Sequence, residues 1–223
     1  YYFLASKNLI INKQSKNIVI NGFFSENLKE EKKIINMLKK PLIKKSFQVF
    51  YTGRLDNNRG SDLLINLSKY LEKDKNFFLT AFTFGDYKIF YELKKKVKNK
   101  NTKLFNEKKR SFYLKNIIGS DISLNLLKSE NFALNSFPSK LIEFFLFSKT
   151  VVSTVKIKNL KNKNFFVTKY DAYSIYNKIK YISKRINIYD REYKKRSLEV
   201  IKNYSINNSH NRFKKYFSWE QIP

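Results

Sequence analysis

Short apolar runs alternate with longer amphipathic segments along most of this chain, and this alternation limits the folds open to it. Residues 48–53 (QVFYTG) and 77–85 (FFLTAFTFG) are mostly apolar or β-branched, and both end in glycine. A strand that is apolar on both sides must be covered on both faces. Between these runs, residues 61–73 repeat leucines at helical spacing. The pattern predicts an α/β domain with a doubly wound parallel sheet.

The same alternation continues to residue 168. We expect further strands at 102–105, 121–127, 150–154 and 165–168, and further helices at 87–99, 108–118 and 139–148.

Three parts are predicted from this element order. Residues 1–40 contain one strand candidate, NIVING (17–22), and are expected to be the end of a preceding domain or a linker. Residues 41–185 form the Rossmann-like domain. Apolar residues recur at helical spacing after residue 171, and residues 186–223 are expected to form a helical tail.

The chain is strongly basic, with 46 Lys and Arg against 18 Asp and Glu, a net charge of +28. Such a charge suits phosphate-rich partners, and a basic nucleic-acid-binding module is one interpretation. However, the basic residues are spread through nearly every segment, and the abundance of Lys, Asn, Ile, Phe and Tyr together is typical of AT-rich coding. No RNP-like or zinc-finger spacing accompanies them. We therefore favour a positive surface for anionic lipid headgroups or polyanionic substrates over nucleic acid.

Cysteine and histidine usage excludes several kinds of site. The chain has no cysteine and a single histidine, His210, so it has no disulfide, no thiolate zinc site and no cysteine nucleophile. We expect no metal site. The apolar stretch at 141–147 is far shorter than the roughly 20 residues that a bilayer span needs. The first residue is Tyr1 rather than Met, which suggests a piece of a longer protein.

The loop after the first strand of the domain carries two arginines and two glycines. Gly53 ends the strand, Arg54 and Arg59 flank the loop, and Gly60 stands just before the next helix. Ligands of open α/β sheets bind beyond the carboxyl ends of the strands. Glycine lets the backbone approach a ligand, and two guanidinium groups can clamp a diphosphate. The alternative is that both arginines are solvated loop charges.

A second loop ends where Pro138 and Ser139 mark a helix start. The backbone N–H groups of Ser139, Lys140 and Leu141 would face the same crevice and favour an anion. Glu143 follows about one turn inside the helix and could accept both hydroxyls of a ribose. Taken alone, Glu143 also fits a surface charge.

Together the two loops resemble the donor half of a GT-B glycosyltransferase of the family 4, or group 1, type. The resemblance is carried, in the family's order, by NIVING, YTGRLDNNRGSDLLI, FTFGD, FPSKLIEFFLFSKTVVST and FSWEQI. It implies a C-terminal, nucleotide-sugar-binding domain whose N-terminal acceptor domain is missing from this chain.

The resemblance also implies an activity. The enzyme would move a sugar, with retention and without metal, from a nucleotide-diphosphate donor to a saccharide or lipid-linked acceptor in bacterial surface polysaccharide assembly. The nucleotide sugar is a substrate, and no cofactor is implied. The donor-binding fragment would be inactive alone, and the protein would lie in the cytoplasm or on the inner face of the cell membrane.

The family pattern assigns roles to particular residues. Arg54 and Arg59 would bind the donor diphosphate and serve catalysis. The remaining implied substrate contacts are Gly53 and Gly60 for the loop, Ser139, Lys140 and Leu141 at the helix start, Glu143 for the ribose, and Phe105 and Asn106 for the base.

Three positions depart from the pattern. Arg59 replaces the usual Lys, and Ser148-Lys149-Thr150 replaces a Gly-Lys-Pro turn. The residue eight positions before Glu143, where the family has a second glutamate, is Asn135. An amide still hydrogen-bonds a sugar hydroxyl, but it carries no charge. A catalytically silent GT-B-like subunit is therefore a further alternative.

Overall fold

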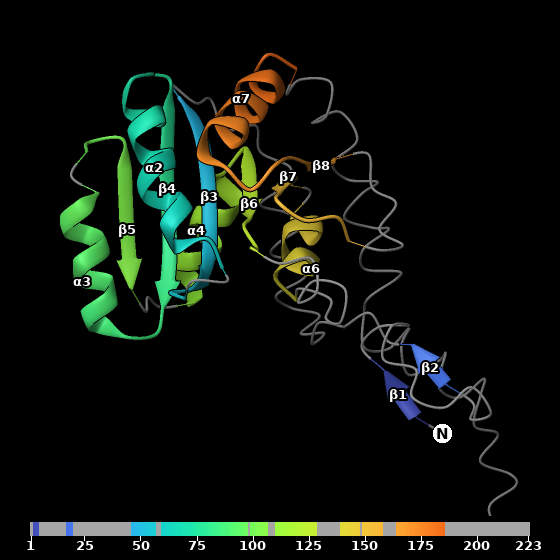
Figure 1. The fold of residues 1–223 in the computed structure, drawn as a ribbon. Helices are drawn as coiled ribbons and strands as arrows, with labels where there is room; N and C mark the ends of the chain where they lie inside the picture. Colours follow the sequence, from blue (N-terminus) through green and yellow to red (C-terminus); the bar gives the residue numbers. More distant parts are fainter. Residues whose placement is uncertain are drawn as a thin grey trace, which may run out of the picture.

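The computed structural model describes residues 2–4, 17–19, 46–56, 59–97, 99–106, 110–128, 139–147, 149–157 and 164–185. Six parallel strands form one sheet in the order β5-β4-β3-β6-β7-β8 (Figure 1). The strands are β3 (Phe47–Arg54), β4 (Phe77–Phe84), β5 (Thr102–Asn106), β6 (Ile122–Asn125), β7 (Thr150–Ser153) and β8 (Phe165–Val167).

Helices cover the sheet on both faces, as Figure 1 shows. The prediction of a doubly wound parallel sheet is thus confirmed. The described helices are α2 (Ser61–Glu72), α3 (Tyr87–Lys96), α4 (Arg110–Gly119), α6 (Ser139–Leu146) and α7 (Ala172–Ser183).

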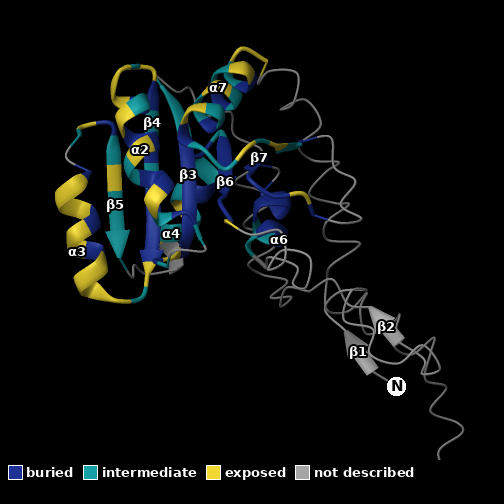
Figure 2. Cartoon of the chain, in the orientation of Figure 1, coloured by how far each residue is buried: buried dark blue, intermediate teal, exposed yellow. Residues whose placement is uncertain are grey.

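The core consists of two apolar clusters, one on each side of the sheet. Tyr51 of β3 packs in the cluster of α2, α3 and α7, whereas its neighbour Phe50 packs in the cluster of α4 and α6. Both side chains are fully buried. Successive strand residues point to opposite faces, so a strand covered on both sides is mostly apolar along its length. Figure 2 shows β3 and β6 buried over nearly their whole length.

The strand order reverses between β3 and β6. From β3 the chain moves outward through β4 to β5, returns to pair β6 with the other side of β3, and moves outward again through β7 to β8. At such a switch point the loops after the two central strands diverge and leave a crevice at the carboxyl edge. The loops after β3 and β6 are the two that sequence analysis selected.

Several element boundaries differ from those expected. Helix α3 ends at Lys96 rather than 99, because Val97 leaves the helical region at φ −101° and ψ 79°. Helix α7 ends at Ser183, and residues 186–223 lie outside the described part of the chain, so the proposed tail stays a prediction.

The head of the chain holds a separate two-stranded sheet. β2 (Asn17–Val19) falls within the strand expected at 17–22. It pairs in parallel with β1 (Tyr2–Leu4), which sequence analysis did not predict. The division into three parts at residues 40 and 185 is untested and stays a prediction. In the described ranges, no helix has the length and apolar character to cross a bilayer.

Candidate functional site

Gly60 sets the geometry of the loop between β3 and α2. It is the N-cap residue of α2 and adopts a left-handed conformation, with φ 75° and ψ 25°. A β-carbon at this position would collide with the side chain of Leu126, which directly follows β6. Gly60 is therefore required both by its dihedral angles and by the close approach of the loop to β6.

Tyr51 of β3 holds the same loop through a hydrogen bond from its side chain. Its buried hydroxyl donates a hydrogen bond of 2.6 Å to the backbone carbonyl of Arg59. Gly53 leaves the space for this contact, since a β-carbon there would lie 2.5 Å from the Tyr51 hydroxyl oxygen. Burial raises the pKa of Tyr51 well above its ordinary value, so the phenol stays protonated and remains a donor.

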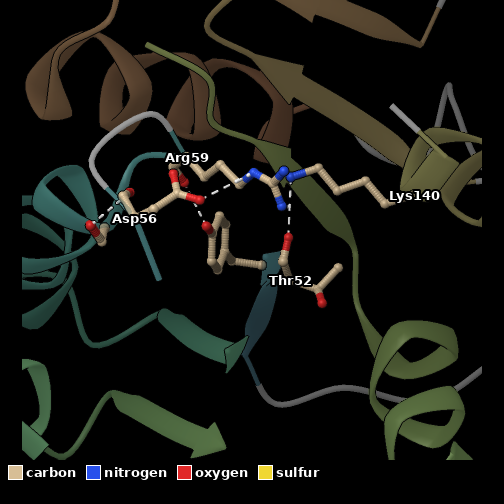
Figure 3. A network of polar contacts seen from close by, with 6 residues as sticks. Thr52, Asp56, Arg59 and Lys140 are labelled. Atoms are coloured by element: carbon tan, nitrogen blue, oxygen red, sulfur yellow. Dashed lines mark hydrogen bonds and ion pairs between the residues drawn. The ribbon is translucent and has the colours of Figure 1, made fainter. Parts of the chain in front are cut away.

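The Arg59 side chain is held by Asp56, three residues earlier. Arg59 Nε lies 3.4 Å from Asp56 Oδ2, and both side chains are about one-third exposed. The carbonyl of Asp56 also accepts the Arg59 N–H at 3.2 Å and the Ser61 hydroxyl at 3.1 Å. These contacts close the loop and orient the guanidinium group at the start of α2 (Figure 3).

Lys140, in the first turn of α6, reaches the end of β3. Its Nζ donates to the carbonyl oxygen of Thr52 at 3.1 Å and lies 5.3 Å from the centre of the Tyr51 ring. Figure 3 shows this amino group beside the guanidinium of Arg59. Burial and, second, the charge of Arg59 lower the pKa of Lys140 to about 7. The structure thus brings two basic groups together at the switch point of the sheet.

Arg54, the last residue of β3, lies at the same edge of the sheet, on the side of the neighbouring strand β4. Its exposed side chain runs beside Gly85, where an added β-carbon would be 3.6 Å from Arg54 Cγ. Gly85 follows β4 in the turn before α3. Arg59 is therefore placed beside Lys140 and Arg54 beside the neighbouring strand. Clamping of one diphosphate by both arginines stays a prediction.

Glu143 is held by a tyrosine from the adjacent helix. The hydroxyl of Tyr113, on α4, donates to Glu143 Oε2 at 2.6 Å. The Tyr113 ring packs edge-on against Phe50 and Phe82 of the core. The carboxylate is therefore held in one direction by a half-buried tyrosine that packs on the core, and it lies one turn beyond Lys140 on α6.

The two residues predicted for the base lie at the end of β5. The carbonyl of Phe105 accepts the Thr83 hydroxyl at 3.2 Å, and its ring packs against Phe82 and Phe112. Both polar atoms of the Asn106 side chain are buried and have no hydrogen-bond partner in the part of the chain that the structure describes. Leaving such a group unsatisfied costs about 1–3 kcal/mol. A ligand at this edge would supply the missing partner.

The remaining predicted residues differ in what the structure says of them. Ser139 begins α6, and Leu141 is a fully buried residue of the core, so its side chain is not available to a ligand. Asn135 and Ser148 lie outside the described residues. Among the residues that the structure describes, His, Cys, Asp and Glu side chains form no group of three suited to a metal ion.

Solved structures resemble this chain over nearly its whole length. A glycosyltransferase from Rickettsia africae has a TM-score of 0.70 at 17% identity, over 97% of this chain and 62% of that one. HepE from Anabaena, solved with UDP and glucose, has a TM-score of 0.67 at 15% identity, with the same coverage. The C-terminal domain of a group 1 glycosyl transferase from Francisella tularensis has a TM-score of 0.56 at 13% identity, over 83% of this chain and 97% of that one.

The chain has the fold of a GT-B C-terminal domain. It spans 62% of the length of the Rickettsia glycosyltransferase and of Anabaena HepE. No protein-family model and no curated protein matches the sequence.

Sequence analysis missed three parts of the candidate site: the hydroxyl of Tyr51, the side chain of Lys140 and the support of Glu143 by Tyr113. Tyr51 had a usable signal, because a tyrosine in a continuous buried strand needs a partner for its hydroxyl. The other two contacts join residues 88 and 30 positions apart, and no local pattern indicates them.

Proposed function

We propose that this chain is the donor-binding part of a retaining, metal-independent glycosyltransferase that transfers a sugar from a nucleoside diphosphate. The observation that carries the proposal is the meeting of Arg59 and Lys140 at the end of β3, beside the point where the strand order reverses. Such a crevice is where α/β domains bind nucleotides, and adjacent cations there suit a diphosphate. The UDP and glucose bound to the structurally similar HepE support the same ligand class.

The difficult step in this reaction is departure of the nucleoside diphosphate. Negative charge grows on the oxygen that leaves the anomeric carbon, and fixed cations stabilise that charge. Arg59 is pre-oriented by Asp56 and by the Tyr51 contact to its carbonyl, so little reorganisation is needed. The positive end of the α6 dipole adds to the same field. In this proposal Glu143, steadied by Tyr113, receives the ribose hydroxyls.

We also propose the wider context. The matched chains extend beyond this one, so an N-terminal half would carry the acceptor site, and the acceptor would be a saccharide or a lipid-linked saccharide. The chain alone would then bind donor without turnover. A net charge of +28 supports association with an anionic membrane surface on the cytoplasmic side. Failure to sediment with anionic vesicles at low salt would argue against that association.

Calorimetric titration of the chain with nucleoside diphosphates and their sugars tests the function. We expect one member of the panel to bind, and Arg59→Ala to weaken its binding about tenfold or more, since a charged hydrogen bond contributes about 1.5–3 kcal/mol. Lys94→Ala is the matched control, because Lys94 is an exposed cation on α3. Equal affinity of the Arg59→Ala and Lys94→Ala variants would remove the proposed diphosphate site. Binding of oligonucleotides but of no nucleotide sugar would favour a nucleic-acid-binding module.

A further inference from the structure

The amino group of Lys140 occupies an unusual position for a lysine. It is turned inward, onto the Thr52 carbonyl and the face of the Tyr51 ring. In the described part of the chain it forms no ion pair with a carboxylate. A lysine with a long flexible stem would ordinarily extend its ammonium into water. Among the described residues, therefore, no acidic side chain accounts for its placement.

Titratable and charged groups face Lys140 from the loop before α2, from β3 and from its own helix, α6. Arg59, in the loop before α2, is the cation beside it, and Asp56 of the same loop pairs with Arg59. Tyr51 of β3 is a neutral phenol. Glu143, on the same helix as Lys140, accepts the Tyr113 hydroxyl. Two cationic groups next to each other repel, and the repulsion is strong where water is partly excluded. An anion between them would turn the repulsion into attraction.

We propose that the Lys140 side chain is a direct ligand of the donor diphosphate, holding a phosphate oxygen beside Arg59 while it keeps its hydrogen bond to Thr52. The inference rests on the proposed function and adds a side-chain contact to it. An ammonium group has three donors, so one can remain on the carbonyl and two can serve the phosphate. Because Thr52 lies just before Gly53 in β3, this bond ties the amino group to the strand end at the crevice.

Proton uptake distinguishes this contact from a purely structural one. Because the pKa of Lys140 is lowered to about 7 in the free protein, the amine is mostly neutral at pH 8. A bound diphosphate favours the ammonium form, so binding at pH 8 should take up about 0.9 proton per site. Nucleotide sugars are the right probes, since their diphosphate is a diester and lacks the terminal phosphate that titrates near pH 6.

The experiment is calorimetric titration of the full chain at pH 8 with UDP-, GDP-, ADP- and dTDP-glucose, in HEPES and in Tris. The dependence of the binding enthalpy on the ionisation heat of the buffer counts the protons. For wild type we expect uptake of about 0.9 proton. Lys140→Met should bind about tenfold or more weakly and take up none. Lys140→Arg should bind without proton uptake, because its guanidinium is always charged. Thermal melting of each variant checks folding, and Lys140→Met should melt no lower than wild type.

The outcomes separate the two proposals. Nucleotide-sugar binding by Lys140→Met with wild-type affinity overturns the role of Lys140 and leaves the diphosphate site at Arg59 standing. Binding by wild type without proton uptake overturns it as well. Absence of binding by these four sugars and by every other nucleoside diphosphate and nucleotide sugar of the panel that tests the function, in wild type and in every folded variant, overturns the proposed function itself.

Discussion

Substitution of Gly60 by alanine should destabilise the domain more than any other single methyl group added to a described glycine. The left-handed conformation of Gly60 costs an alanine roughly 1–2 kcal/mol. The new β-carbon would also collide with Leu126, and overpacking of this kind costs typically about 1–3 kcal/mol. Together we expect a loss of about 2–5 kcal/mol in the free energy of unfolding.

The matched control is Gly119→Ala at the end of α4. No heavy atom lies within 4 Å of a β-carbon at Gly119, and this residue has no positive φ. Alanine there should stabilise the domain by about 0.4–1 kcal/mol by reducing the freedom of the unfolded chain. Urea denaturation of wild type and both variants, followed by circular dichroism, measures the difference. If Gly60→Ala unfolds at the same urea concentration as Gly119→Ala, the argument from backbone strain and close approach is wrong.

Two further predictions concern the other helices. Tyr113→Phe removes the hydrogen bond to Glu143, so binding of a ribonucleotide should weaken about threefold to tenfold, with little change for the 2′-deoxyribonucleotide; equal losses would contradict a ribose contact of Glu143. Asp171 caps α7 by accepting the Ser174 N–H at 2.9 Å, and hydrogen bonds from the Ser174 side chain and, second, from this N–H lower the pKa of its carboxyl. The cap therefore stabilises the fold above about pH 4 and is lost as the pH falls below that value. Asp171→Asn keeps a capping oxygen but does not titrate, so it should flatten the pH dependence of the melting temperature between pH 5 and pH 3 relative to wild type. Asp171→Ala removes the cap and should lower the free energy of unfolding by about 1 kcal/mol at pH 7. An unchanged pH profile in Asp171→Asn would exclude this role.

Asn106 and Phe105 differ in what they offer at the end of β5. The Asn106 amide has one acceptor and two donors, and both polar atoms are buried without a hydrogen-bond partner among the described residues. The ring of Phe105 faces the other side of the sheet, where it packs with Phe82 and Phe112. The side chains of these adjacent residues therefore differ in role. Phe105 supports the core, and Asn106 presents the polar group.

Sequence patterns alone determined the architecture. Strands such as β3 and β4 are apolar at successive positions because both faces of the sheet are covered, and α2 repeats leucines every three or four residues because only one of its faces is buried. These periods follow from local backbone geometry, so they are legible in a single sequence. The same patterns located the two loops at the switch point and selected Gly53, Arg54, Arg59 and Gly60, whereas Lys140 was selected only for its backbone N–H.

Only the tertiary structure decided which of these groups meet. Lys140 bonds to Thr52 from 88 positions away, Glu143 is held by Tyr113 of another helix, and Arg54 lies beside Gly85 at the end of the neighbouring strand. Such contacts depend on how the helices cross the sheet and on the rotamer of each side chain. Neither of these produces a periodic pattern of residues in the sequence. The lowered pKa of Lys140 has the same origin, because burial and the nearness of Arg59 exist only once β3, α2 and α6 have packed together.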